Sequence, residues 1–368
     1  MSASKTGIGG KRRSTAPGLL ATASLALLLL LVGGGWSPAR ATGPALWFAS
    51  PQQQPGPPGA VGGLVEIRPF WLSASGTPAQ VKIEETAEPL ANTSGLAFQA
   101  NGSLWVCTLN NTVLKFTFGQ LESLGVDPHP APEATITSSA FKFNIGCVLS
   151  PFGSIWVVDA SNNAVHKISR AQLIAATTAG GTTDIPPANM VTITDNTDLS
   201  SPSFAAFDPA GNLWVSSLSN SKLVEFSASH LGTSNATATG DVVISSASLN
   251  EPGQPQFDAA GNLWVTNAGN NTVVKFTPAQ LAASGAPTAD AIISDDGSGS
   301  LVTPWGCSFD SLGRLWVFNY GTATSTTTTI SMFGIGQLSV SGPTSPTPRR
   351  TLSGLPPFAA QLTFGPRY

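Results

Sequence analysis

Three aspartates stand at matched positions of a repeated pattern and are the first side chains to consider for chemistry. Asp208, Asp258 and Asp310 each follow a phenylalanine in a Phe-Asp-x-x-Gly sequence. Recurring carboxylates suggest a metal site, since hard cations prefer oxygen ligands. The same sequence is typical of a tight turn, in which an Asp side chain accepts hydrogen bonds from the backbone two residues on. We interpret these aspartates as turn residues.

The histidines offer little for acid–base catalysis. His129 and His230 fall in connections between predicted strands, and His166 falls within a predicted strand. The chain has no Gly-x-Ser-x-Gly nucleophile elbow, no His-Glu-x-x-His motif and no phosphate-binding loop. The sequence therefore indicates no standard catalytic constellation.

A repeated unit must position all of these side chains, and tryptophans mark its copies. The clearest copy is FDAAGNLWVTNAGNNTVVKFTPAQL, residues 257–281. Its equivalents recur about every 50 to 58 residues, a period typical of propellers or arrays. The anchoring residues are Trp105, Trp156, Trp214, Trp264 and Trp316.

Each copy predicts four strands. Residues 263–266 and 272–276 alternate with period two, and Gly- and Asn-rich turns bound them. The Phe-Asp segment supplies a strand before them, and an apolar run such as 291–293 supplies one after them. We name these strands a to d in chain order. Repeated four-stranded units are typical of a β-propeller, in which the sheets are arranged around an axis.

The ends of the chain supply one further blade. Residues 46–49, 64–67 and 80–83 match strands b, c and d, and no strand a precedes them. Residues 361–365 match strand a, and no strand b follows. The sequence therefore predicts an all-β, six-bladed propeller of four-stranded antiparallel blades, closed by a C-terminal strand that joins the N-terminal blade and leaves no exposed edge between the chain ends.

The connections divide between the two faces of this disc. The d–a links and b–c turns share one face, where residues 51–59 and 321–329 form two neighbouring insertions. The c–d links share the other face. Several read as a helical turn with a Ser or Thr cap and a leucine that packs under the blade, as in residues 277–281. The insertions either wall a groove or are tolerated surface loops.

The repeat signature, F-D-x-x-G-N-L-W-V-x-N-x-x-N-N-T-V-V-K-F, resembles the NHL-repeat and gluconolactonase-like six-bladed propellers over nearly all of residues 42–368. The resemblance implies that hydrolase relatives hold a divalent cation at the channel mouth with Glu, Asn and Asp side chains at the entries of strand a. The aligned positions here carry no acid or amide: they are Ser94, Ile145, Ser203, Gly253, Trp305 and Ala360.

Substitute ligands nearby define a candidate site on the channel face. Glu251 and Asp159 are its acids and the only weak candidates for a calcium or magnesium ion, so no metal is assigned. Aromatic rings beside neutral amides suit recognition of carbohydrate or peptide, and they equally suit packing that closes the channel. The candidate residues are Glu251, Asn92, Asn144, Asp159, Asn267, Asn319, Trp305 and Tyr320.

Three cysteines are too few for a disulfide framework. Strand alternation places Cys107 on the tryptophan face of its blade and Cys147 on the opposite face of the next blade. A disulfide between them is one interpretation. Buried thiols acting as small apolar groups are the other.

Residues 1–41 differ from the rest of the chain. A basic segment at Lys11-Arg12-Arg13 precedes a 14-residue apolar run from Leu19 to Val32, and Ala39-Arg40-Ala41 fits a cleavage site. This pattern predicts a secretory signal peptide cut after Ala41, followed by a single propeller domain, residues 42–368. An uncleaved anchor and export by the twin-arginine route are the alternatives. We expect a secreted or periplasmic protein without a stable membrane span.

The low charge limits the choice of partners. Charged residues make up 10% of the chain, the net charge is −3, and there is no basic stripe, so we expect no nucleic-acid partner. The sequence favours a monomeric, non-catalytic module that binds a protein, peptide or carbohydrate and needs no cofactor. The alternative is a metal-dependent, lactonase-like hydrolase with a site around Glu251, in which the cation would polarise the carbonyl and activate water.

Overall fold

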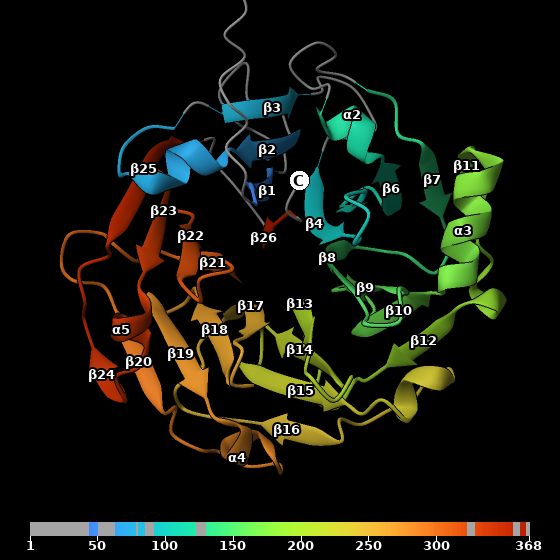
Figure 1. The fold of residues 1–368 in the computed structure, drawn as a ribbon. Coiled ribbons are helices and arrows are strands. Elements are labelled where there is room, and N and C mark those ends of the chain that lie inside the picture. Colours follow the sequence, from blue (N-terminus) through green and yellow to red (C-terminus); the bar gives the residue numbers. More distant parts are fainter. Residues whose placement is uncertain are drawn as a thin grey trace, which may run out of the picture. The chain divides into compact units, whose positions relative to one another are not determined.

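The computed structural model describes residues 44–50, 63–78, 80–84, 92–122, 130–321, 328–355 and 361–365. They form six sheets arranged around an axis, with the innermost strand of each sheet facing the centre (Figure 1). The six-bladed propeller and its all-β class are confirmed. The predicted signal peptide, His129, the insertion at 51–59 and most of the insertion at 321–329 lie outside the described residues.

Blades 1 to 3 follow the predicted strand order from the axis outward. In blade 1 the strands are β26 (Leu362–Phe364), β1 (Leu46–Ser50), β2 (Gly63–Ile67) and β3 (Gln80–Glu84). In blade 2 they are β4 (Thr93–Phe98), β5 (Leu104–Thr108), β6 (Thr112–Phe116) and β7 (Ala134–Thr137). In blade 3 they are β8 (Asn144–Leu149), β9 (Ile155–Asp159), β10 (Ala164–Ile168) and β12 (Val191–Thr194).

Blades 4 to 6 repeat the same arrangement. In blade 4 the strands are β13 (Pro202–Phe207), β14 (Leu213–Ser217), β15 (Lys222–Phe226) and β16 (Val242–Ile244). In blade 5 they are β17 (Pro252–Phe257), β18 (Leu263–Asn267), β19 (Thr272–Phe276) and β20 (Ala291–Ser294). In blade 6 they are β21 (Pro304–Phe309), β22 (Leu315–Asn319), β23 (Thr328–Phe333) and β25 (Arg350–Leu355).

The ring closes as the sequence predicts. Strand β26, from the end of the chain, pairs antiparallel with β1, with Leu46 opposite Phe364 and Phe48 opposite Leu362. The C-terminal strand thus supplies the inner strand of blade 1. This closure joins the two ends of the chain within one sheet and leaves no open edge there.

The c–d links do more than connect strands. Each contains a short helix or helical turn: η1 (Pro69–Ser73), α2 (Phe118–Glu122), α3 (Arg170–Ala179), η3 (His230–Gly232), α4 (Pro278–Leu281) and α5 (Ile335–Leu338). Blade 3 adds a second turn, η2 (Pro187–Asn189), before β12. Each of the six link helices buries its leucine, as the sequence predicted for the links of blades 3, 4 and 5.

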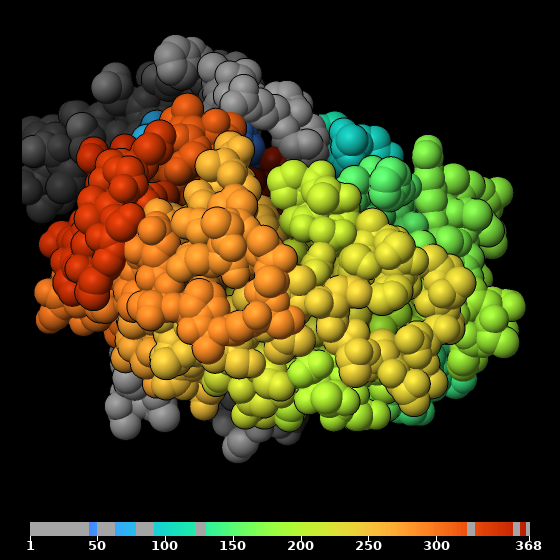
Figure 2. All heavy atoms as spheres, turned by 90° about the horizontal axis from the view of Figure 1, so that it is seen from below, coloured from blue at the N-terminus to red at the C-terminus, as the bar shows by residue number. Residues whose placement is uncertain are grey.

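The same links cover the outer strand of the preceding blade. Strand β11 (Gly181–Asp184), in the link of blade 3, pairs parallel with β7 of blade 2, and β24 (Gly342–Thr344), in the link of blade 6, pairs parallel with β20 of blade 5. Isolated bridges join the links of blades 1, 4 and 5 to the preceding blades in the same way. Two sheets therefore have five strands, which the sequence did not predict because these segments lack apolar alternation. The outer surface over blades 4 and 5 is continuous (Figure 2).

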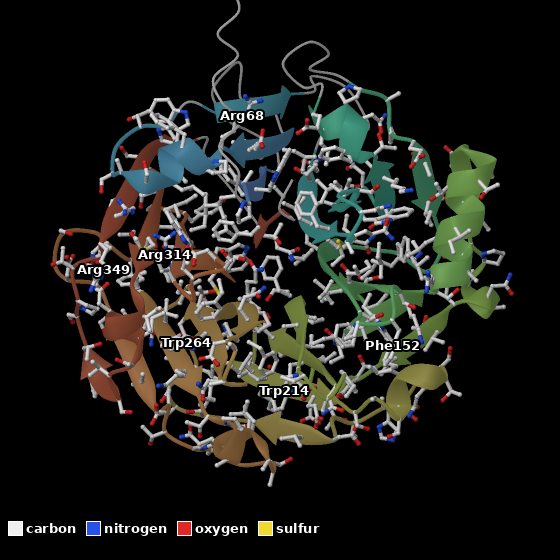
Figure 3. All side chains as sticks on the ribbon, viewed as in Figure 1. Arg68, Phe152, Trp214, Trp264, Arg314 and Arg349 are labelled. Atoms are coloured by element: carbon white, nitrogen blue, oxygen red, sulfur yellow. The ribbon has the colours of Figure 1, made fainter. Side chains whose placement is uncertain are left out.

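The core lies between the blades. Each apolar cluster combines the tryptophan face of one blade with the opposite face of the next, so the tryptophans occupy equivalent places around the ring, as Trp214 and Trp264 show in Figure 3. At several interfaces the tryptophan meets the phenylalanine of the next repeat edge-on. Ring centroids are 6.5 Å apart for Trp214 and Phe257 and 6.3 Å apart for Trp264 and Phe309. Such T-shaped pairs add stability beyond the area they bury.

Candidate functional site

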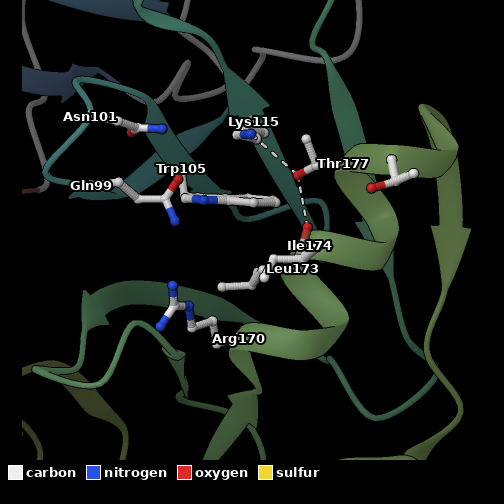
Figure 4. Close-up of a pocket in the computed structure, with 9 residues that line it drawn as sticks. Gln99, Asn101, Trp105, Lys115, Arg170, Leu173, Ile174 and Thr177 are labelled. Carbon is white, nitrogen blue, oxygen red and sulfur yellow. Dashed lines mark hydrogen bonds between the residues drawn. The ribbon is translucent and has the colours of Figure 1, made fainter.

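A groove opens between blades 2 and 3 on the face that carries the a–b turns and c–d links. It consists of two adjoining cavities of about 240 and 700 Å³ that share Gln99, Asn101 and Arg170. Figure 4 shows the smaller cavity, in which Trp105 and Lys115 come from blade 2 and Arg170, Leu173 and Ile174 come from α3. We call this feature the blade 2–3 groove. Its size falls in the range of small-molecule sites.

Two departures from the repeat accompany the groove at this interface. Blade 3 has Leu149 where other blades have the phenylalanine that packs on the preceding tryptophan. Blade 2 has Gln99 where blades 4 to 6 have the turn aspartate. A leucine covers less of Trp105 than a phenylalanine ring does, and Gln99 does not bring a carboxylate to the indole.

The floor of the groove contains a buried donor without an acceptor. Trp105 is fully buried, and among the described residues its indole Nε1 has no hydrogen-bond partner. Lys115 lies over the indole ring at 5.8 Å from its centroid, but its charge is already paired, since its Nζ lies 2.8 Å from a Glu133 oxygen. The same Nζ donates to Thr177 Oγ1 at 3.3 Å. An unsatisfied buried donor costs free energy that a ligand acceptor would recover.

The mouth of the groove carries a cation and apolar side chains. Arg170 lines both cavities, and its aliphatic portion lies over Gly153 of the hairpin below. No ion pair of Arg170 occurs among the described residues. Phe152 is 78% exposed and Ile174 is 56% exposed. The groove thus combines a guanidinium group, neutral amides and apolar contact surface, which suits a polar ligand with an apolar part.

The sequence did contain a signal for this groove. The aligned repeats show that Gln99 and Leu149 depart from the Phe-Asp pattern, but only the structure shows that the two positions flank the same tryptophan. The turn aspartates themselves behave as predicted. Asp258 Oδ1 accepts from the backbone N–H groups of Ala260 and Asn262, each at 2.9 Å.

The predicted residues at the ends of strand b serve the backbone. Asp159, Asn267 and Asn319 are all buried. Asp159 accepts from the N–H groups of Lys142 and Phe143 at 2.9 and 3.1 Å, and Asn267 and Asn319 make comparable bonds to the d–a links of their blades. These side chains fasten each d–a link to its blade, so their polar atoms are already engaged in the described structure.

The predicted residues of the d–a links also have structural partners. Glu251 and Asn92 adopt left-handed backbone conformations, with φ of 48° and 68°. The Glu251 N–H donates to Ser221 Oγ at 3.2 Å, and Asn92 donates to the side chain of Asn110 at 3.2 Å. Asn144 differs, because it is fully buried and both polar atoms of its amide lack a partner in the described structure.

Aromatic and amide side chains make contacts across the channel. The ring of Trp305 meets Phe204 edge-on, with centroids 5.9 Å apart, although the two lie on blades 6 and 4. Tyr320 is half-buried, and burial raises its pKa to about 12. The structure therefore shows the packing role of Trp305 that the sequence left open beside ligand recognition.

Two channel glutamines that sequence reasoning missed join blades across the axis. Gln254 Oε1 accepts from the N–H groups of Cys307 and Leu362 at 3.1 and 3.0 Å, which links blade 5 to blades 6 and 1. Gln361 accepts from the Leu96 N–H at 2.8 Å and donates to the Cys147 carbonyl at 3.1 Å. The two occupy the same repeat position, three residues before the phenylalanine of strand a, but three other blades have glycine there and one has phenylalanine, so the repeat signature does not mark it.

The cysteines and acids form neither a disulfide nor a metal cluster among the described residues. Cys107 and Cys147 pack in one apolar cluster, which confirms that their faces meet, but both are free thiols rather than the disulfide considered from the sequence. Burial, together with the neighbouring Cys147 thiol, raises the pKa of Cys107 well above its usual range. No three His, Cys, Asp or Glu side chains in the described part of the chain gather as metal ligands.

Comparison with known proteins supports the fold. No protein-family model and no curated protein sequence matches this chain. Among solved structures, a protein of unknown function from Bacteroides caccae has a TM-score of 0.56 and 9% identity, covering 88% of this chain and 99% of the other. A catalytically inactive virginiamycin B lyase from Staphylococcus aureus with quinupristin has a TM-score of 0.50 and 13% identity, covering 83% and 86%. Likeness at this level shows a shared propeller fold and carries no activity with it.

Proposed function

We propose that this protein is an exported propeller that binds a small peptide or carbohydrate ligand in the blade 2–3 groove and does not catalyse its conversion. The observation that supports this most directly is the combination of Trp105 Nε1, buried without a partner in the described structure, and an adjoining open cavity of about 700 Å³. Export rests on the signal-peptide pattern of residues 1–41.

The placement differs from the channel face that the sequence favoured. On that face, Asp159, Asn267 and Asn319 use their polar atoms for the backbone, and Trp305 packs on Phe204. On the groove face, Arg170 has no ion pair among the described residues, and Phe152 is exposed. Exposed aromatic and guanidinium groups beside a cavity are typical of binding surfaces. NHL-like membership remains part of this proposal, based on the repeat signature.

The indole N–H signals of the eight tryptophans in residues 42–368 provide the test. The Trp105 signal is assigned by its loss in Trp105→Phe, and a library of neutral sugars, short peptides and small acids is screened for compounds that shift it. We expect such compounds to exist and to bind more weakly to Phe152→Ser. Leu312→Ser is the matched control, because Leu312 occupies the same hairpin position in blade 6 and is 60% exposed. A Trp105 signal that no compound moves would rule the groove out as the site.

A further inference from the structure

In blades 4 to 6, the turn aspartate accepts a hydrogen bond from the indole N–H of the repeat tryptophan. Asp208 Oδ2 lies 3.3 Å from the Nε1 of Trp214. The equivalent distances are 2.9 Å from Asp258 to Trp264 and 2.9 Å from Asp310 to Trp316. In three blades, therefore, a carboxylate from the same repeat satisfies the indole N–H.

Blades 1 to 3 lack that carboxylate, and in blades 1 and 2 the indole Nε1 also lacks a partner in the described structure. Gly365 and Gln99 stand at the aspartate position, and Trp47 Nε1 and Trp105 Nε1 are buried without a hydrogen-bond acceptor. The two sites differ in space. Gly365 lies directly against the Trp47 ring, whereas Trp105 lines a cavity. Only Trp105 of this pair thus combines the unpaired donor with room for a ligand.

Blade 6 also shows how a guanidinium group joins such a pair. Arg314 Nε donates to Asp310 Oδ2 at 2.6 Å, and Trp316 Nε1 donates to the same oxygen. In the blade 2–3 groove, Arg170 and Trp105 line the same cavity, and no carboxylate lies between them among the described lining residues (Figure 4). Lys115 does not compete for an incoming anion, because Glu133 already pairs with it.

We propose that the groove recognises a ligand carboxylate, which takes the place that the turn aspartate holds in blades 4 to 6. The carboxylate accepts from Trp105 Nε1 and pairs with Arg170, while an apolar part of the ligand packs on Phe152 and Ile174. This inference rests on the proposed function and specifies its ligand. The ligand class is a carboxylate on an apolar or aromatic skeleton, either a free acylated amino acid or the C-terminus of a peptide.

The first test compares charged and neutral forms of one probe. Hippurate and its neutral amide, hippuramide, are titrated while the Trp105 indole signal is followed. We expect hippurate to shift the signal saturably and hippuramide to bind at least about tenfold more weakly, as loss of a charge-assisted hydrogen bond predicts. A tetrapeptide with a free C-terminus and the same peptide amidated distinguish a peptide end from a free acid. Equal binding of hippurate and hippuramide would overturn the inference.

The second test rebuilds the missing carboxylate within the chain. Gln99→Asp restores the residue of blades 4 to 6, so we expect it to bond Trp105, abolish hippurate binding and raise the unfolding midpoint. Gln99→Asn is the matched control, because the asparagine side chain is nearly the same size as aspartate but uncharged. This variant should still bind hippurate. Arg170→Gln should weaken hippurate about tenfold and leave hippuramide unchanged. Thermal unfolding confirms that each variant is folded.

The outcomes separate this inference from the proposed function. If neutral compounds shift Trp105 and hippurate does not, the groove binds ligands but not carboxylates, and only the inference fails. Equal hippurate affinities for Gln99→Asp and Gln99→Asn would also contradict it. If no compound of either charge shifts Trp105, the inference and the proposed function fail together.

Discussion

Asp159 and His166 form a fully buried hydrogen-bonded pair within blade 3, with 3.3 Å between Oδ2 and Nε2. The other ring nitrogen of His166 lies 3.0 Å from Thr192 Oγ1. Asp159 also accepts from the backbone of the d–a link, so the Asp159–His166 pair joins strands β9, β10 and β12 to the segment that leads into β8. The pair therefore stabilises the arrangement of strands in blade 3.

We expect Asp159→Ala to destabilise the protein by about 3 kcal/mol, because the change leaves the buried His166 and the N–H groups of Lys142 and Phe143 without their acceptor. Urea unfolding of the purified protein measures the loss. Asp184→Ala is the comparison, since Asp184 is an exposed carboxylate and its removal should cost no more than about 0.5 kcal/mol. Equal losses of unfolding free energy in the two variants would show that the Asp159 hydrogen bonds do not stabilise blade 3.

Acid should weaken the same contact. Burial by itself raises the pKa of Asp159, but hydrogen bonds from His166, Lys142 and Phe143 outweigh it, so the pKa lies below its usual range. A lowered folded-state pKa gives stability that is complete above the unfolded value, near 4, and is lost as the pH falls through the folded value. Asp296, whose pKa is lowered to about 2 chiefly by its hydrogen bond from Ser298, adds to the same trend.

We therefore expect the contribution of these two aspartates to the free energy of unfolding to be nearly constant from pH 5 to 7 and to decrease below about pH 4. Urea midpoints measured across this range test the sign. The fall should be shallower in Asp159→Asn, which cannot titrate at this position. A midpoint that rises on acidification below pH 4 would contradict the expected sign.

We expect the channel glutamines to contribute more to the free energy of unfolding than an ordinary polar side chain does. Gln254→Leu removes the acceptor of the Cys307 and Leu362 N–H groups and the donor to the Leu362 carbonyl, all of them in the buried channel. We expect a loss of about 2 to 4 kcal/mol. Gln256→Leu, on the same strand β17 but partly exposed, is the control and should be nearly neutral. If both variants unfold at the same urea concentration, the cross-axis bonds do not stabilise the ring.

The link that covers blade 4 allows a clean backbone test. The Gly285 N–H donates to the Val243 carbonyl at 3.0 Å, so Gly285→Pro removes that bond and should cost about 1 kcal/mol or more. Gly285→Ala keeps the donor, and the added Cβ meets no atom within 4 Å. Hydrogen exchange at residues 242–244 should accelerate in the proline variant and stay unchanged in the alanine variant. Identical exchange in both variants would show that the link does not protect the edge.

The cysteines should be inert in the native state. Burial raises the pKa of Cys107 and Cys307 above their usual range, so little reactive thiolate forms. We expect iodoacetamide to modify none of the three thiols in native protein and all three after denaturation without reductant, as counted by mass spectrometry. A single modification after denaturation would instead reveal the Cys107–Cys147 disulfide.

The aligned repeat was enough to predict the propeller, the blade number and the closing strand. Its tryptophans, turn aspartates and alternating apolar residues are local signals, and each strand carries its own copy. The repeat did not predict the hydrogen-bond partners of the channel-face candidates. Asp159 was correctly placed at the end of strand b, but its carboxylate bonds to backbone groups 16 and 17 residues away, which no repeat pattern marks.

The sequence by itself determined the fold of each blade and the order of the blades around the axis, because strand alternation and turn chemistry depend on residues close together in the chain. Only the tertiary structure decided where a ligand can reach the protein. The blade 2–3 groove needs Gln99, Leu149 and Arg170 around one tryptophan, and these residues come from two different blades. A side chain on one blade finds its partners on the next, so packing between blades, which the repeat period does not encode, decides which donors are satisfied and which stay open.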